Sequence, residues 1–388
     1  MCFVGGHMNF EFATATRIVF GAGKLAELGG LVRDLGTQAL VVSGRRSAPA
    51  TQVSDLLQVA GVAITRFVVA GEPTIASVEA GTQLARASGC EFVVAIGGGS
   101  VIDAGKAIAA LLANGGEVLD YVEIVGRGRT LNIPARPFIA IPTTAGTGAE
   151  VTRNAVLASP EHRVKVSLRS ALMLPTVALV DPVLTYDLPP SLTASTGLDA
   201  LTQLIEPFTC NRANPLTDAI CREGMTRVAR SLRVAYHDGR NAKAREDMAL
   251  AGLFGGLALA NAGLGAVHGF AAPIGGMFAA PHGAVCAALL PHVMSMNLRA
   301  LQQSGFSGAR YDEVARLLTA DSTAMADAGV RWVRELVREL NVPGLGAYGI
   351  CDADVNGLVA KATNASSIKA NPVVLAPQEL SEILKAAL

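Results

Sequence analysis

The sequence predicts an α/β domain built on a parallel sheet, followed by an all-helical domain. In the first half, short runs rich in Val and Ile alternate with stretches whose apolar residues recur at helical spacing. After Pro189 and Pro190 the strand signals vanish, and helical patterns separated by Gly, Pro and Asn follow. Strands that alternate with helices indicate a parallel sheet covered on both faces. We therefore expect one domain over residues 1–186 and a second over residues 187–388.

Six short runs carry the strand signal. Between them, segments such as KLAELGGLVRDLG place leucine and valine three or four residues apart, which is typical of one face of a helix. The expected strands are residues 17–20, 39–42, 64–69, 92–96, 137–144 and 176–181.

A long uncharged run extends from Leu250 to Met294. It is long enough for one or two transmembrane helices, which need about 20 apolar residues each. However, its flanks lack the clusters of Lys, Arg, Trp and Tyr that anchor membrane spans. Glycines and prolines also break it into short helical pieces with two turns, namely Gly255, Gly256, Gly263, Gly265, Pro273, Gly275, Gly276, Pro281 and Gly283. We therefore expect buried helices of a soluble protein and no membrane span.

The composition excludes some classes of partner. The chain has 388 residues, of which 51% are hydrophobic and 16% charged, so it can bury a large core. The 32 Lys and Arg balance the 32 Asp and Glu, which leaves no basic field for nucleic acid or an anionic membrane. The six cysteines show no CxxC spacing, and the first residues carry no signal-peptide pattern. We expect a cytoplasmic protein that binds a small molecule.

A glycine-rich turn joins a predicted strand to a predicted helix of residues 101–113. It comprises Gly97, Gly98, Gly99 and Ser100. Glycines allow a ligand close to the backbone, and the helix N-terminus offers free N–H groups and a partial positive charge. A phosphate would fit there, although an ordinary turn with Ser100 as the N-cap explains the same residues. Neither the GxGxxG fingerprint nor a P-loop is present.

Two further loops follow predicted strands of the same sheet. One carries Thr143, Thr144 and Thr147, and it would meet the glycine turn at the edge where parallel sheets bind ligands. The other reads Ser43, Gly44, Arg45, Arg46, and it has two arginines where an acid often binds the adenosine ribose. The arginines favour the 2′-phosphate of NADP(H) over NAD(H), unless they are only a solvated surface pair.

Candidate metal ligands lie in the second half. Asp199 and Gln203 are four residues apart and share one helix face. His268 and His282 lie in the uncharged run, where imidazoles are rarely solvent contacts. A lone buried histidine usually only bonds within the core, but two of them with a helical carboxylate suit a divalent metal such as Zn²⁺ or Fe²⁺. We interpret His292 as structural.

Four ordered motifs together resemble the iron-containing (group III) alcohol dehydrogenase family, which includes maleylacetate-reductase-like members. They read GGGSVIDAGKAIA, PTTAGTGAEVTRNAVL, TGLDALTQLIE and VHGFAAPIGGMFAAPHGAVCAALLPHVM, and the resemblance covers essentially the whole chain. It implies a Rossmann-like dinucleotide-binding domain, a helical domain, an active site in the cleft between them, and a homodimer. It also implies cofactor contacts from Gly97, Gly98, Gly99, Ser100, Asp103, Thr143, Thr144, Thr147, Asn154 and Lys165.

The resemblance implies a metal held by Asp199, His268 and His282, with two departures from the family pattern. The motif DAxxH reads DALTQ, which puts Gln203 where a histidine belongs, and amide oxygen is a weaker ligand for Zn²⁺ or Fe²⁺. HGxxH reads HGFAA, so Ala272 replaces a histidine used near the substrate. Water or the cofactor ribose would then relay the proton.

The function that follows is metal-assisted hydride transfer between NAD(P) and a small alcohol, aldehyde or ketone. Asp199, His268 and His282 are its expected catalytic residues, and Phe254 and Phe270 are either apolar walls or ordinary core. One alternative is a maleylacetate reductase, which works without the usual metal set. Another is a synthase of the dehydroquinate type, which needs several Lys and Arg around a phosphorylated substrate, and the uncharged run is a poor source of them.

Overall fold

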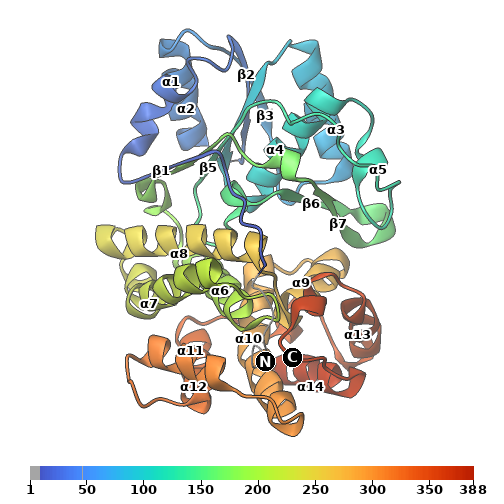
Figure 1. The fold of residues 1–388 in the computed structure, drawn as a ribbon. Coiled ribbons are helices and arrows are strands. Elements are labelled where there is room, and N and C mark those ends of the chain that lie inside the picture. The colour runs from blue at the N-terminus through green and yellow to red at the C-terminus, as the bar shows by residue number, and fades with distance from the viewer. Residues whose placement is uncertain (1–8, 46) are drawn as a thin grey trace. The chain divides into compact units, whose positions relative to one another are not determined.

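The computed structural model describes residues 9–45 and 47–388. They divide into two compact units, one formed by residues 14–187 and the other by residues 188–388 with residues 9–13 (Figure 1). The break therefore lies beside residue 186. The assignment of the N-terminal residues to the helical unit was not expected. Asn261 explains it, because its side chain accepts a hydrogen bond from Ala13 N at 2.6 Å and donates one to Ala13 O at 2.9 Å.

The first unit contains a six-stranded sheet in the order β1-β8-β5-β4-β2-β3. All of its pairings are parallel, which confirms the predicted fold class. Each strand overlaps one of the six predicted runs. Their bounds are β1 Arg17–Phe20, β2 Gln38–Ser43, β3 Ala63–Val68, β4 Phe92–Gly97, β5 Phe138–Pro142 and β8 Val177–Val180.

Helices cover both faces of this sheet. Side chains alternate across a strand, so Leu40 and Val42 pack into one core while Ala39 and Val41 pack into the other. The first core includes residues of α3 (Ile75–Ala87), α4 (Gly99–Asn114) and α5 (Val118–Tyr121), and the second those of α1 (Leu28–Leu31) and α2 (Ser47–Val59). Burial on both faces explains why the central strands are continuously apolar.

An antiparallel hairpin interrupts the α/β pattern and was not expected. It consists of β6 (Asn154–Ser159) and β7 (Val164–Arg169), with Asn154 opposite Arg169. Apolar and polar residues alternate along β7, which reads VKVSLR, and that alternation was the signal in the sequence. The turn passes through Arg163, whose φ of 51° lies in the left-handed region.

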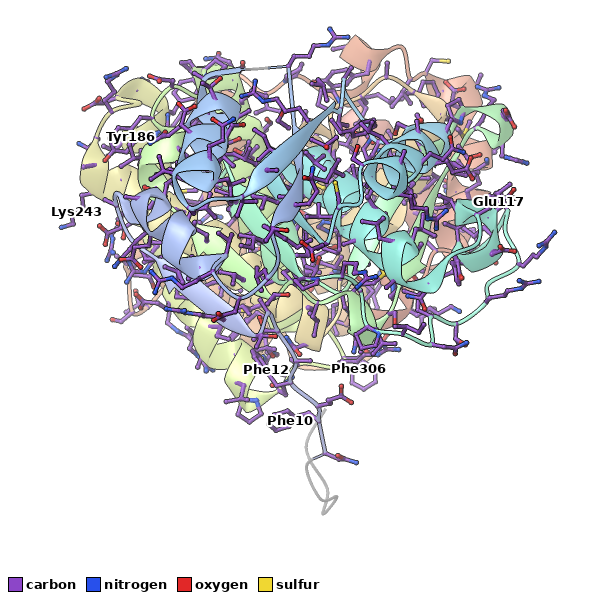
Figure 2. The ribbon with its side chains drawn as sticks, turned by 90° about the horizontal axis from the view of Figure 1, so that it is seen from above. Phe10, Phe12, Glu117, Tyr186, Lys243 and Phe306 are labelled. Carbon is purple, nitrogen blue, oxygen red and sulfur yellow. The ribbon has the colours of Figure 1, made fainter. Side chains whose placement is uncertain are left out.

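The second unit is helical throughout the part of the chain that the structure describes. Its first helices are α6 (Pro190–Thr209), α7 (Pro215–His237), α8 (Ala242–Asn261), α9 (Ala266–Met277) and α10 (His282–Gln303). They are followed by α11 (Ala309–Thr319), α12 (Ala326–Glu339), α13 (Val355–Thr363) and α14 (Pro377–Ala387). Short 3-10 helices occur at Lys24–Glu27, Ala149–Val151, Pro160–His162, Ala171–Met173, Pro182–Thr185, Leu345–Tyr348, Asp352–Asp354 and Ser367–Ala370. Surface side chains such as Lys243 and Phe306, which is 52% exposed, project outward (Figure 2).

The uncharged run forms the end of α8, all of α9 and the start of α10, with the two expected turns between them. Several of the expected breaks are wrong, since Gly255 and Gly256 lie inside α8, Pro273, Gly275 and Gly276 inside α9, and Gly283 inside α10. Gly255 is needed for packing, because a Cβ there would approach Gln203 Cβ of α6 to 3.1 Å. By length and composition α10 is apolar enough to cross a membrane, but 83% of its apolar window is buried inside the structure. α8 and α9 pass the same test only together, and they are bent by 98°.

Candidate active site

Helix α6 carries three buried polar side chains on successive turns. Pro190 occupies its first turn, where a missing N–H costs nothing. Asp199 is 1% exposed, Gln203 2% and Glu206 5%. Polar side chains this deeply buried need polar partners. The neighbouring helices α9 and α10 provide them for Asp199 and Glu206.

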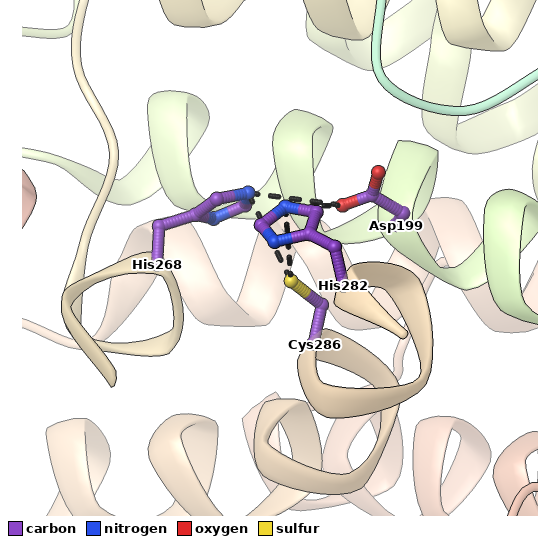
Figure 3. Close-up of side chains that lie close together, drawn as sticks. All are labelled: Asp199, His268, His282 and Cys286. Carbon is purple, nitrogen blue, oxygen red and sulfur yellow. Dashed lines mark hydrogen bonds and ion pairs between the residues drawn. The ribbon is translucent and has the colours of Figure 1, made fainter. Parts of the chain in front are cut away.

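Four side chains from three helices place their ligand atoms together (Figure 3). Asp199 Oδ1 lies 3.7 Å from His268 Nε2 and 3.5 Å from His282 Nε2. Cys286 Sγ lies 3.9 Å from His268 Nε2 and 3.7 Å from His282 Nε2. All four atoms are within 4.8 Å of one another. The structure thus gathers the predicted acid and both predicted imidazoles, and it adds a cysteine that was not predicted.

The packing of α10 against α6 brings this cluster together. His282 is the first residue of α10 and Cys286 lies one turn later, so both side chains leave the same face. Gly283 allows the close approach, because a Cβ there would lie 2.4 Å from the backbone oxygen of Ser195. The sequence signal for Cys286 was therefore its spacing of four residues from a predicted ligand.

Glu206 orients His268 from behind. Its Oε2 lies 2.6 Å from His268 Nδ1, and its Oε1 accepts a hydrogen bond from Val267 N at 2.7 Å. A carboxylate in this position favours the tautomer with the proton on Nδ1, which turns the lone pair of Nε2 toward the cluster. Glu206 was also missed, although it follows Asp199 by two helical turns within a quoted motif.

The electrostatics of the cluster suit a divalent cation. Burial opposes the ionisation of Asp199, but His282 and His268 outweigh it and lower the pKa of the carboxyl. Burial likewise opposes protonation of His268, but Cys286 and Glu206 outweigh it and hold its pKa well above the usual value. Asp199 Oδ1 is buried without a hydrogen-bond partner among the described residues. A bound cation would replace the imidazole protons and satisfy this oxygen, so the side chains fit a metal.

Gln203, the predicted fourth ligand, lies one turn after Asp199 on α6. Its Oε1 is buried and has no hydrogen-bond partner among the described residues. A Cβ on Gly255 of α8 would lie 3.3 Å from this oxygen. Its role as a ligand stays a prediction. Of the two expected wall residues, Phe270 is completely buried and belongs to the core, while Phe254 is partly buried.

In the other unit, the glycine turn follows β4 at the carboxyl edge of the sheet. Helix α4 begins at Gly99, two residues before the predicted start, and Gly98 is its N-cap, so the alternative explanation with Ser100 as the N-cap is wrong. The reason is that Gly98 already has the extended backbone conformation of an N-cap residue, although it has no side chain to cap the helix. No side chain caps α4, which leaves N–H groups of its first turn available to an anion.

The threonine loop lies against this turn. Gly97 pairs with Pro142 of the neighbouring strand, and Gly97 O accepts a hydrogen bond from Thr143 N at 2.9 Å. A Cβ on Gly98 would lie 3.4 Å from Thr144 Cγ2, and one on Gly99 would lie 2.8 Å from Thr147 Oγ1. The structure therefore brings the two loops together, as predicted. Thr143, Thr144, Thr147 and Ser100 are all partly exposed.

The remaining predicted cofactor residues have partners within the protein. Asp103 Oδ2 accepts a hydrogen bond from Val156 N at 3.0 Å, and burial raises the pKa of this carboxyl. Asn154 begins β6, and Lys165 Nζ lies 2.6 Å from Glu72 Oε2. Asp103 thus joins α4 to the unexpected hairpin. Their contacts with a cofactor stay predictions.

Lys106 was not singled out, yet it holds the threonine loop. Its side chain is completely buried, and it donates hydrogen bonds to Ala149 O at 2.7 Å, Thr152 Oγ1 at 2.9 Å and Asn154 O at 2.8 Å. Burial lowers the pKa of its ammonium group. Three carbonyl or hydroxyl acceptors satisfy the ammonium donors, which makes Lys106 a structural residue.

The loop after β2 ends on the same edge of the sheet, because Ser43 pairs with Ile96 of β4. Ser43 is buried, Gly44 is partly exposed and Arg45 is exposed. Arg46 lies outside the described residues.

The chain resembles known proteins over most of its length. Residues 15–182 match the family described as iron-containing alcohol dehydrogenase, and residues 193–388 match the C-terminal part of the Fe-containing alcohol dehydrogenase family. Alcohol dehydrogenase 4 of Saccharomyces cerevisiae is 37% identical over 92% of this chain and 90% of its own. A crystal structure of 1,3-propanediol oxidoreductase is 32% identical, with a TM-score of 0.92 over 98% of this chain and 100% of that one.

A sulfoacetaldehyde reductase from Bifidobacterium kashiwanohense, whose structure was solved in complex with NAD⁺, is also similar. It is 28% identical, with a TM-score of 0.87 over 98% of this chain and 99% of that chain. The two family matches together cover nearly the whole sequence, and the gathered side chains form a candidate metal site. The chain therefore belongs to the iron-containing alcohol dehydrogenase family and is an NAD(P)-dependent oxidoreductase of small alcohols, aldehydes or ketones.

Proposed function

We propose that the enzyme reduces a small aldehyde or ketone, and oxidises the corresponding alcohol, at a divalent-metal site made by Asp199, His268 and His282. The observation that carries this proposal is the convergence of these three side chains around a buried carboxylate oxygen that has no hydrogen-bond partner among the described residues. When bound, the nicotinamide carries the hydride and the cation withdraws electron density from the substrate oxygen.

The protein's own contribution is binding and orientation. Glu206 fixes the ring of His268, and helices α6, α9 and α10 keep all three ligands in place, with Asp199 and His268 buried and His282 partly exposed. One turn after His268, Ala272 supplies no imidazole, so the proton of the alcohol comes from water or a cofactor hydroxyl. An Ala272→His variant should therefore shift the pH profile of turnover, whereas an unchanged profile would count against this relay.

The proposed cofactor site is the edge formed by the glycine turn and the threonine loop. Uncapped N–H groups at the start of α4 are suited to the pyrophosphate, and the partly exposed threonines are suited to further contacts. We favour NADP(H), since Ser43, Gly44 and Arg45 include no acid for a ribose 2′-hydroxyl and Arg45 is exposed. A higher kcat/KM with NADH than with NADPH would contradict this preference.

Two alternatives are less well supported. A maleylacetate reductase would not need a metal, so it gives no reason for Asp199 to meet two imidazoles in a buried cluster. A synthase would need several cations around a phosphorylated substrate, but the ligand-bearing helix segments are almost free of them. We further propose a cytoplasmic homodimer, to be checked by sedimentation and fractionation.

The test of the proposed function combines metal analysis with activity. Protein purified without chelators should contain about one equivalent of Zn or Fe, and it should oxidise NADPH or NADH with small aldehydes. The variant His268→Ala should lose the metal and most turnover together, whereas His237→Ala, at an exposed site on α7, should keep both. Full activity of metal-free His268→Ala would refute the metal mechanism, and reduction of maleylacetate by metal-free wild type would favour the reductase alternative.

A further inference from the structure

We infer that Cys286, and not Gln203, is the fourth protein ligand of this centre, and that its thiolate directs the site toward Zn²⁺ in preference to Fe²⁺. The inference rests on the proposed function, since it takes Asp199, His268 and His282 as metal ligands. It goes further by assigning a different fourth residue and a metal class.

The separations of the ligand atoms match a coordination shell. A tetrahedral zinc ion with bonds of about 2.0–2.1 Å to nitrogen or oxygen and about 2.3 Å to sulfur has ligand-to-ligand separations of about 3.3–3.6 Å. The four separations between the carboxylate or sulfur and the two imidazoles run from 3.5 to 3.9 Å, and all four ligand atoms lie within 4.8 Å of one another. For these four pairs a contraction of a few tenths of an ångström would suffice, and a fifth position would take the substrate oxygen.

Two further observations show that the cluster is oriented toward a common ligand. Asp199 Oδ1 is buried and has no hydrogen-bond partner among the described residues, so one lone pair remains for a cation. His268 uses its other nitrogen to contact Glu206, which leaves Nε2 facing Cys286. Cys286 itself is completely buried on a rigid helix, one turn after His282. The sulfur is therefore held beside the other three ligand atoms by the fold.

Gln203 is the weaker candidate for a chemical reason. Its Oε1 is buried without a hydrogen-bond partner among the described residues, as Asp199 Oδ1 is, but an amide oxygen carries no net charge. A thiolate at Cys286 together with the Asp199 carboxylate would neutralise a divalent cation. Thiolate ligands favour zinc, whereas harder oxygen and nitrogen ligands accept iron as readily. The chain's departure from histidine at position 203 is thus offset by the sulfur on α10.

The experiment is a titration of the metal-free full-length protein with Co²⁺, which reports its ligands spectroscopically. A thiolate bound to Co²⁺ gives an intense near-ultraviolet charge-transfer absorption that carboxylate and imidazole ligands do not give. Wild type should bind about one equivalent and show this absorption. Cys286→Ser should lose the absorption and bind Zn²⁺ at least ~10-fold more weakly in competition with a chelating dye.

Two variants serve as controls. Gln203→Ala should keep both the absorption and the stoichiometry. Cys221→Ser, which changes a thiol that is equally buried on α7, should also behave as wild type. Because the wild-type spectrum alone reports the sulfur ligand, the test stays decisive even if Cys286→Ser fails to fold.

The outcomes separate this inference from the proposed function. One equivalent of Co²⁺ without the absorption would overturn the role of Cys286 while leaving the metal site intact. Loss of binding in Gln203→Ala but not in Cys286→Ser would also overturn it, in favour of the amide. Failure of wild type to bind Co²⁺, Zn²⁺ or Fe²⁺ would overturn both the inference and the metal part of the proposed function.

Discussion

Gly283 offers a sharp test of how the metal site is assembled, because its missing side chain lets α10 approach α6. A Cβ added there would lie 2.4 Å from Ser195 O, 2.8 Å from Ser195 C and 3.3 Å from Asp199 Cβ. Backbone atoms cannot rotate away as the end of a flexible side chain can. In Gly283→Ala the two helices must therefore separate, which moves His282 away from Asp199.

The expected cost lies in the middle of the range for overpacked cores, which is about 1–3 kcal/mol. We expect Gly283→Ala to lose about 2 kcal/mol of unfolding free energy, which lowers the Tm by about 4–8 °C in a unit of this size. Because the adjacent ligand is displaced, we also expect metal affinity to fall about 10-fold or more. Thermal unfolding followed by circular dichroism and a chelator competition measure the two effects.

Gly357→Ala is the matched control. This glycine also lies in a helix, α13, but no atom lies within 4 Å of a Cβ built there. Alanine should therefore stabilise the helix by up to about 1 kcal/mol without affecting the metal. If Gly283→Ala had the Tm and metal affinity of wild type, the close contact between α6 and α10 would be wrong and so would the reasoning.

Three other variants test separate parts of the molecule. Gly99→Ala puts a Cβ 2.8 Å from Thr147 Oγ1. NADPH should therefore bind about 10-fold more weakly in a fluorescence titration, while the metal content stays unchanged. An unaltered affinity for NADPH would exclude this loop as the cofactor site. Glu206→Gln should weaken metal binding about 10–100-fold in a chelator competition. Glu206→Asp has a shorter side chain that should not restore the short contact with His268, so its metal affinity should stay low in the same assay. Burial raises the pKa of Glu150 to about 7, so the folded protein keeps a proton that the unfolded chain releases near pH 4.5. The unfolding free energy should therefore fall by about 3 kcal/mol as the pH rises from about 4.5 to about 7. In denaturant titrations, the unfolding free energy of Glu150→Gln should depend less on pH.

The sequence by itself determined the class of fold and the main elements. Runs of apolar β-branched residues reveal buried parallel strands, because such strands have no solvent face and therefore no alternation. The hairpin of Asn154–Arg169 was missed because the alternation in β7 is short and the hairpin follows directly on a loop rich in Thr and Gly. The start of α4 was also misplaced, since a glycine N-cap leaves no polar side chain to mark it.

The residues of the candidate metal site likewise fall into those that the sequence predicts and those that only the structure reveals. Local spacing was enough to single out Asp199, since a carboxylate on an apolar helix is costly to bury without a purpose. Only the tertiary structure brought in Cys286 and Glu206, because their roles depend on which helix faces pack against each other. The distance along the sequence does not reveal that the Cys286 thiol on α10 meets the His268 imidazole on α9. The need for a glycine at position 283 is clear only from the backbone of α6 that packs against it. Local preferences thus determine the elements, while the packing of helices distant in the chain decides the ligands.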